Sequence, residues 1–286
     1  MSLLPHQLWE RIENFDTELL SDNRKQLHQA IQNVAAVGRL FLPESEKDEE
    51  AFLVWIPELS RIAGKWIQGE VKFRSSINPE SFTVHLVDTS LTTLSSLELY
   101  GKKQGAVMVW LEEQLALLQL DTSNISLTLP YKLPKYPQAK GKPFKPDPEA
   151  QQFLTILFHN SWLAISQTIS ALGIDAEPVI KPNHFYMVAV DTVKDTGDEE
   201  ISACVRMGMT PGDDIMDEPY IYVNVFPFPS IKGFGPLPHG EWYEDEWVGA
   251  IYRLADIAKI ESAPEQHRSV LSFYQEVYKT LRATIK

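Results

Sequence analysis

The stretch YIYVNVF, residues 220–226, alternates strictly between two kinds of side chain. Successive residues of a β-strand point to opposite faces of a sheet, so this stretch predicts a strand with one aliphatic and one aromatic face. The aliphatic face is expected to be core. The aromatic face is expected to be either a second packed layer or the wall of a ligand pocket. It consists of Tyr220, Tyr222, Asn224 and Phe226.

Two further strands are expected just before this one, over residues 185–193 and 201–209. Periodicity places His184 and Tyr186 on one face of the first strand and Arg206 on the same face as Cys204 in the second. If the registers align, these faces form an aromatic cleft with one cation to hold an anionic group. The candidate ligand-binding residues are therefore His184, Tyr186, Arg206, Tyr220, Tyr222, Asn224 and Phe226.

The rest of the chain predicts an α+β fold with two α-β-β-β-α-like halves, each a mainly antiparallel sheet flanked by helices. Helical periodicity marks residues 5–14, 21–42, 106–120, 149–172 and a last helix that starts after Ser262 with capping-box spacing to Glu265. Short alternating runs predict strands within residues 51–100 and at 124–129, and His85 is expected to be a surface histidine.

Residues 130–148 contain six prolines and five lysines, which excludes a helix or a central strand. This segment is interpreted as a connector, so the expected organisation is an N-terminal half 1–129, a connector 130–147 and a C-terminal half 148–286. A solvated linker accounts for the lysines. A basic docking strip or lid is the alternative.

Composition limits the classes of partner. The 286-residue chain has a formal net charge of −13, which repels nucleic acid and anionic membranes. Cys204 is the only cysteine, so it forms no internal disulfide and is expected to be a small buried residue. With no leader or membrane-spanning run recognised, the chain is expected to be soluble and cytoplasmic, without a cofactor.

Catalytic signatures of the common nucleotide-binding and hydrolase types are absent from the sequence. Residues 213–246 are rich in acids, and paired carboxylates beside a histidine can hold a divalent cation that activates water. This alternative site would consist of Asp213, Asp214, Asp217, His239 and Glu241. Turn formation and solvated loops explain the same acids without any metal.

Several short motifs in the last hundred residues resemble an uncharacterised bacterial domain family, in which an aromatic-x-aromatic strand closes on Pro-x-Pro. The motifs are His184-Phe185, Met209-Thr210-Pro211-Gly212, Glu218-Pro219-Tyr220-Ile221-Tyr222, Phe226-Pro227-Phe228-Pro229, Trp242-Tyr243 and the final helix from Pro264 to Leu281. The resemblance implies a shared architecture. That family has no established activity, so no catalytic residue follows from it.

Three functions remain open. The leading hypothesis is a non-enzymatic protein that binds a small ligand, or a partner, on the aromatic face of residues 220–226. The second is a metal-assisted hydrolase that uses the acidic 213–246 region. The third is an oligomerisation module, in which the aromatic face forms an interface between subunits of a homo-oligomer.

Overall fold

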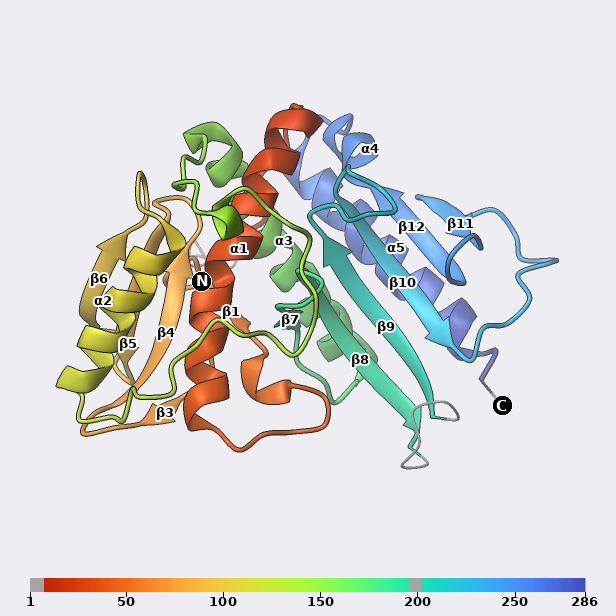
Figure 1. The fold of residues 1–286 in the computed structure, drawn as a ribbon. Helices are drawn as coiled ribbons and strands as arrows, with labels where there is room; N and C mark the ends of the chain where they lie inside the picture. Colours follow the sequence, from red (N-terminus) through yellow and green to blue (C-terminus); the bar gives the residue numbers. More distant parts are fainter. Residues whose placement is uncertain (1–7, 196–201, 286) are drawn as a thin grey trace. The chain divides into compact units, whose positions relative to one another are not determined.

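The computed structural model describes residues 8–195 and 202–285, which form two compact units (Figure 1). The α1 unit comprises Asp16–Thr155 and Ile180–Phe185, and the α5 unit comprises Met1–Phe15, Ile156–Val179 and Tyr186–Lys286. This division differs from the expected halves, because the proline-rich segment 130–147 belongs to the α1 unit. The helix α3, Pro148–Leu172, passes from one unit into the other.

The sheet of the α1 unit is antiparallel throughout and has the strand order β1-β2-β4-β5-β6, with β3 paired to β4. It confirms the strands expected within residues 51–100. The strands are β1 Val54–Ile56, β2 Arg61–Ala63, β3 Ile67–Gln68, β4 Lys72–Asn78, β5 Thr83–Asp88 and β6 Thr93–Glu98. The short 3-10 helix η2, Glu49–Ala51, precedes them.

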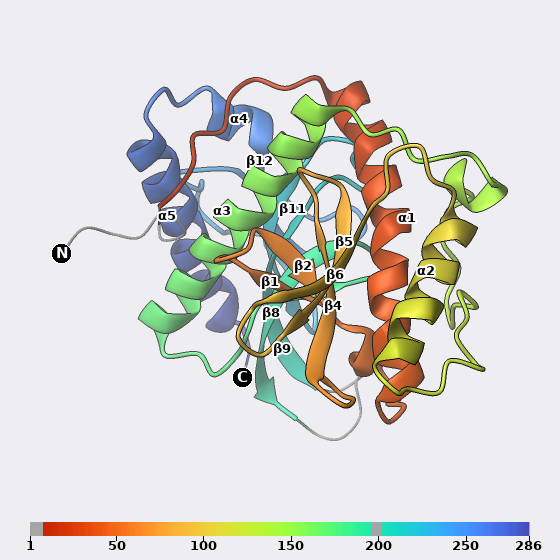
Figure 2. The same cartoon turned by 90° about the vertical axis from the view of Figure 1, so that its left-hand side faces the viewer.

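Two helices lie side by side on one face of this sheet (Figures 1 and 2): α1, Thr17–Phe41, and α2, Gln104–Leu117. Val37 of α1 and Leu111 of α2 share a buried apolar cluster with Phe73 of β4. Removing such side chains from water is the main source of stability in a core of this kind. Asp16 caps α1, so this helix begins four residues before the expected start at residue 21.

Two expected elements of the first 130 residues are wrong. Residues 124–129 form no strand. They alternate in the sequence, but a strand also needs a neighbour for its backbone hydrogen bonds, and these residues pair with none in the described chain.

The segment 130–147 contains only the 3-10 helix η3, Gln138–Lys140, as its prolines predict.

Residues 8–14 form no helix either, while residues 5–7 of that expected helix lie outside the described residues. Side chains of the α5 unit hold this segment instead. Gln266 accepts a hydrogen bond from the Ile12 N–H at 2.8 Å and donates one to the Ile12 carbonyl at 2.7 Å. Asn160 bonds both backbone groups of Glu10 in the same way. These partners replace the bonds that a helix would supply.

The sheet of the α5 unit is also antiparallel, with neighbouring strands in the order β11-β12-β10-β9-β8. The three expected strands are confirmed within the described residues, and Ile201, the expected start of one of them, lies outside. The strands are β8 Tyr186–Lys194, β9 Ala203–Thr210, β10 Tyr220–Phe226, β11 Glu241–Tyr243 and β12 Gly249–Arg253. The short β7, Val179–Lys181, lies where the chain changes units.

Helix α5, Ala263–Arg282, packs on the face of this sheet that carries the aliphatic residues of β10 (Figure 1). The Tyr274 hydroxyl donates to the Gly208 carbonyl at 2.9 Å, and Phe273 contacts Tyr252. Ser262 is the N-cap residue, but its side chain makes no capping bond, so the expected capping box is not formed. The shorter α4, Leu254–Ala258, precedes α5.

The α+β class is confirmed: helix, antiparallel sheet and helix follow one another twice along the chain. In the described part of the chain, no helix has the length and apolar character needed to cross a membrane.

Candidate functional site

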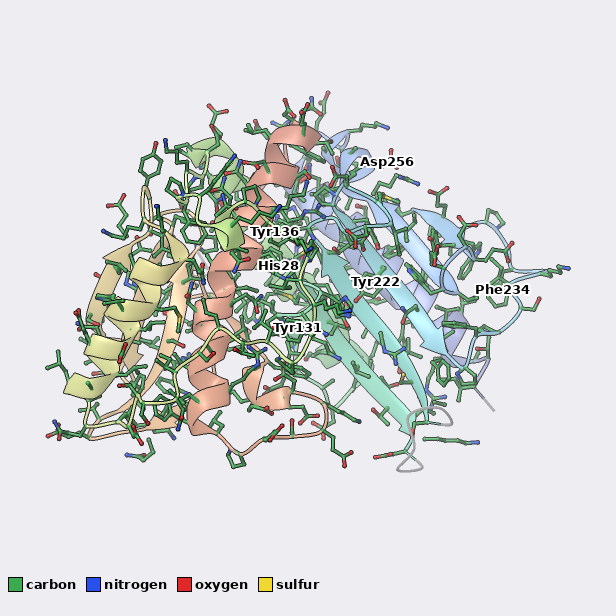
Figure 3. All side chains as sticks on the ribbon, viewed as in Figure 1. His28, Tyr131, Tyr136, Tyr222, Phe234 and Asp256 are labelled. Carbon is green, nitrogen blue, oxygen red and sulfur yellow. The ribbon has the colours of Figure 1, made fainter. Side chains whose placement is uncertain are left out.

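The aromatic face of β10 is assembled much as the sequence suggested. Tyr222 (Figure 3) is 8% exposed. Its ring contacts the rings of Tyr186 and Tyr220 at centroid distances of 6.4 and 6.2 Å. Arg206 stands opposite Asn224 in the β9–β10 register, so both point to this face. The structure therefore brings six of the seven candidate ligand residues onto one sheet, with Phe226 at its edge.

Other side chains of the α5 unit cover this aromatic face. Trp247 packs on Tyr222 at 5.8 Å, and Tyr243 packs on Trp247 at 4.5 Å. Burial raises the pKa of Tyr222 well above its ordinary value. Around Tyr222 the face is thus a packed layer, one of the two alternatives that the sequence left open.

Two of the seven candidates lie apart from the centre of this layer. His184 is an exposed turn residue of the α1 unit, because β8 begins only at Tyr186. The expected strand position of His184 is therefore wrong. Phe226 ends β10 beside a cis Phe226–Pro227 bond and contacts Phe228, so it stays on the expected face but at its edge.

Three of the five acidic-site candidates, Asp213, His239 and Glu241, have separate structural partners. Asp213 accepts hydrogen bonds from two backbone N–H groups of its own turn and from the Tyr220 hydroxyl at 2.7 Å. Glu241 pairs with Arg253 at 3.1 Å, and His239 stacks on Tyr252. Across the described residues, no group of three His, Cys, Asp or Glu side chains is arranged to hold a metal ion. Asp214 and Asp217 are exposed loop residues.

An open cavity of about 700 Å³ lies in the α1 unit, where the N-terminus of α2 meets the η3 turn. Its size falls within the range of small-molecule sites. No candidate residue from the sequence lies in it. The cavity is lined by Gly101, Lys102, Lys103, Gln104, Gly105, Ala106, Gln138, Ala139 and Gly141.

Backbone hydrogen bonds fix the loop before α2. The Gly101 N–H donates to the Phe144 carbonyl, and the Phe144 N–H donates to the Lys102 carbonyl, both at 2.8 Å. Gly101 has a φ of 74° and Gly141 a φ of 85°, which favour glycine at both positions. Phe144 is fully buried against Phe82, so this contact anchors the two cavity walls to the core.

The N-terminus of α2 has no side-chain cap and no acidic residue in its first turn. The first N–H groups of an α-helix lack partners within the helix, and the helix dipole adds positive potential there. Asp16 caps α1 and Asp147 caps α3, whereas α2 presents Lys102 and Lys103. Neither lysine forms an ion pair within the described residues.

Two glutamines that line the same cavity each have an unpaired side-chain oxygen. Gln104 is 8% exposed and Gln138 is 6% exposed, and the Oε1 atom of each is buried without a hydrogen-bond partner in the described chain. An unpaired buried carbonyl of this kind costs about 1–3 kcal/mol. Nε2 of Gln104 donates to Oδ1 of Asn33 at 2.9 Å, which fixes the side-chain amide so that its oxygen is the unpaired atom.

The segment 131–147 is held along α1 by polar side chains of that helix. Nδ1 of His28 lies 2.9 Å from the Tyr136 hydroxyl (Figure 3), and Gln26 bonds both backbone groups of Lys145. The Tyr131 hydroxyl donates to Gln32 and accepts from Arg39, each at 2.7 Å. The expected connector is therefore a fixed part of the α1 unit, and its η3 turn forms one wall of the cavity.

The sequence signal for this cavity is weak but present. Residues 101–105 read Gly-Lys-Lys-Gln-Gly and lead into the apolar helix α2, with a lysine at the cap position where acidic and hydroxyl residues are preferred. The contribution of Gln138, Ala139 and Gly141 depends on how segment 131–147 folds back onto α1.

Comparison with known proteins adds no relative: no family model, no curated protein and no solved structure matches this chain.

Proposed function

We propose that this protein binds a small molecule in the cavity at the N-terminus of α2. The ligand would carry a phosphate or comparable anionic group together with hydroxyl or amino groups. One observation carries the proposal: the same cavity is lined by a helix N-terminus without a side-chain cap and by two glutamines whose Oε1 atoms have no hydrogen-bond partner in the described chain. The leading hypothesis from the sequence, ligand binding without catalysis, is kept, but at a different site.

The anionic group of the ligand is assigned to the α2 end of the cavity. A helix N-terminus binds phosphate through its free N–H groups and its dipole. Lys102 and Lys103 add two positive charges in a chain whose net charge is −13. An anion held there would supply the hydrogen-bond acceptors and the negative charge that a capping carboxylate supplies at other helices. Gly105 allows the anion to approach closely because it has no side chain.

The hydroxyl or amino groups of the ligand are assigned to the glutamines. The Oε1 atoms of Gln104 and Gln138 accept hydrogen bonds and cannot stabilise an anion, so they require a donor. A bare inorganic anion leaves them unpaired. A sugar phosphate offers both kinds of group in one molecule.

We propose that a small molecule is the main partner and that the protein acts in the cytoplasm, where its single cysteine would stay reduced. The acidic chain disfavours nucleic acid and anionic membranes as partners.

The test is calorimetric titration with ribose 5-phosphate as the probe, with ribose and inorganic phosphate as controls. Ribose 5-phosphate is expected to bind at least tenfold more tightly than either control, a difference of about 1.4 kcal/mol. The double variant Lys102→Gln/Lys103→Gln should lose at least tenfold in affinity. The matched pair Lys132→Gln/Lys135→Gln removes the same charge from the neighbouring segment, outside the cavity lining, and should bind like the parent protein.

The proposal fails if ribose 5-phosphate does not bind. It also fails if the two lysine pairs weaken binding equally, because the effect would then reflect net charge and not the cavity.

A further inference from the structure

The sheet of the α1 unit carries a second group of unpaired polar side chains, on the face that points away from α1. Ser75 donates to the Val34 carbonyl of α1 at 3.0 Å, so its neighbour Ser76 points to the opposite face. The strand register places Arg74 and His85 on the same face as Ser76, and Arg61 on the same face as Ala63, which pairs with Ser76. We call Arg61, Arg74, Ser76 and His85 the arginine face.

The two arginines belong to neighbouring parts of this face, with the Ser76–His85 pair between their rows. Arg74 pairs with Val87, and Val87 pairs with Thr93 on the next strand. Arg61 starts on β2, yet its guanidinium lies 3.4 Å from the Thr93 hydroxyl. Its side chain therefore extends over the Ser76–His85 row towards the row that holds Arg74. The Arg74 guanidinium itself stacks on the Trp66 ring at 4.3 Å.

No carboxylate compensates these two charges within the described chain: neither arginine forms an ion pair. Burial lowers the pKa of both, and the charge of the exposed Glu58 acts on Arg74 alone. Four atoms are buried without a hydrogen-bond partner among residues 8–195 and 202–285: Nε of Arg61, Nε of Arg74, Oγ of Ser76 and Nδ1 of His85. Four such atoms on one face leave the polar side chains of the arginine face without the hydrogen bonds that buried polar groups usually have.

We propose that the arginine face binds a small dianion, a phosphate group or a dicarboxylate, through the guanidinium groups of Arg61 and Arg74. The planar guanidinium donates two parallel hydrogen bonds to an oxyanion, so two arginines match two negative charges. The Ser76 hydroxyl supplies a third donor. This site is independent of the α2 cavity and does not rest on its proposed ligand.

The experiment follows the arginine Nε–Hε signals of the full-length protein by NMR at constant ionic strength. The probes are inorganic phosphate and malonate, with chloride as the control. The Arg61 and Arg74 signals are expected to shift with at least one dianion and not with chloride. A response to phosphate alone assigns a phosphoryl ligand, and a response to malonate as well assigns dianions in general.

Variants separate this site from general charge effects. Arg61→Gln and Arg74→Gln should each weaken the dianion response at least tenfold and abolish the rise in unfolding temperature that the dianion causes. Both should fold, because each removes one of two uncompensated charges. Arg268→Gln, at an exposed arginine paired with Glu265, is the matched control and should respond like the parent.

A variant of the α2 cavity tests whether the two sites are independent. Gly105→Trp should leave the dianion response unchanged. Absence of a shift with either dianion, or a shift that survives Arg61→Gln and Arg74→Gln, overturns the assignment.

Discussion

Nε2 of Gln104 donates a 2.9 Å hydrogen bond to Oδ1 of Asn33, and Nδ2 of Asn33 donates in turn to the Ala30 carbonyl. A side chain of α1 thus sets the orientation of a cavity residue on α2. Because both amides are buried, the bond links the stability of the α1 unit to the shape of the proposed site.

Gln104→Leu is therefore expected to destabilise the protein by about 1–3 kcal/mol, since it leaves Oδ1 of Asn33 buried without a donor. Urea unfolding measures this loss. The double variant Asn33→Leu/Gln104→Leu removes both partners and should cost less than the sum of the two single variants. Strict additivity would show that the bond does not couple the two helices.

His28 predicts a pH dependence of stability. Burial lowers its pKa from 6.5 to about 4. Nε2 lies 2.8 Å from the Pro182 carbonyl, which can only accept, so Nε2 carries the proton and the Tyr136 hydroxyl donates to Nδ1. Because the pKa of His28 is lower in the folded protein, the stability that neutral His28 contributes is complete above pH 6.5. This stability is lost as the pH falls towards 4. The integrated effect is roughly 3 kcal/mol.

Unfolding free energies of the parent and His28→Gln, measured from pH 7.5 to 4, test this. The difference between the two proteins should shrink as the pH falls. Tyr136→Phe is the control: it removes one hydrogen bond, costs about 1 kcal/mol and keeps most of the pH slope. A difference that stays constant with pH contradicts a neutral buried His28.

Gly208 shows why the aromatic face of β10 is a packed layer. A Cβ atom at Gly208 would lie 2.5 Å from the Tyr222 ring and 2.6 Å from the Met187 carbonyl. Gly208→Ala should therefore cost more than about 2 kcal/mol, because the backbone contact cannot relax. Tyr222→Ala should cost about 3–5 kcal/mol by leaving a cavity. Thermal unfolding checks both, and near-parental stability of Tyr222→Ala would favour an open pocket instead.

Gly105 allows the α2 cavity to be closed without strain. Within α2, a Cβ atom at Gly105 would meet nothing within 4 Å. Gly105→Trp should abolish binding of ribose 5-phosphate while its free energy of unfolding stays within about 1 kcal/mol of the parent value. Gly105→Ala, the control, should bind normally and gain up to about 1 kcal/mol from helix propensity. Equal binding by all three proteins would place the ligand elsewhere.

The parts of the fold that local pattern determines were predictable. The alternation of residues 220–226 became β10, and the helical periodicity of residues 149–172 became α3. The sequence could not show that residues 124–129 form no strand, because alternation does not indicate whether a neighbouring strand is present. The short β11 and β12 carry too few residues for a clear period, so the sequence did not reveal them.

For the candidate site, too, local sequence pattern did not reveal contacts between distant segments. Tyr186, Arg206 and Tyr222 were correctly placed on one face, because strand periodicity determines faces. The sequence could not show that Trp247 covers that face, since this depends on the path of a loop. It also could not join Gln138 to Gln104, because side-chain bonds from α1 to Tyr136 and Lys145 position the η3 segment.

The most direct test of ligand binding at the N-terminus of α2 is a titration of the ¹⁵N-labelled protein with ribose 5-phosphate, followed through its backbone amide signals. Ligand binding in the α2 cavity predicts saturable shifts centred on Gln104, Gly105 and Gly141, with no comparable change at Tyr222. Shifts confined to other parts of the chain, or none at saturating ribose 5-phosphate, would contradict it.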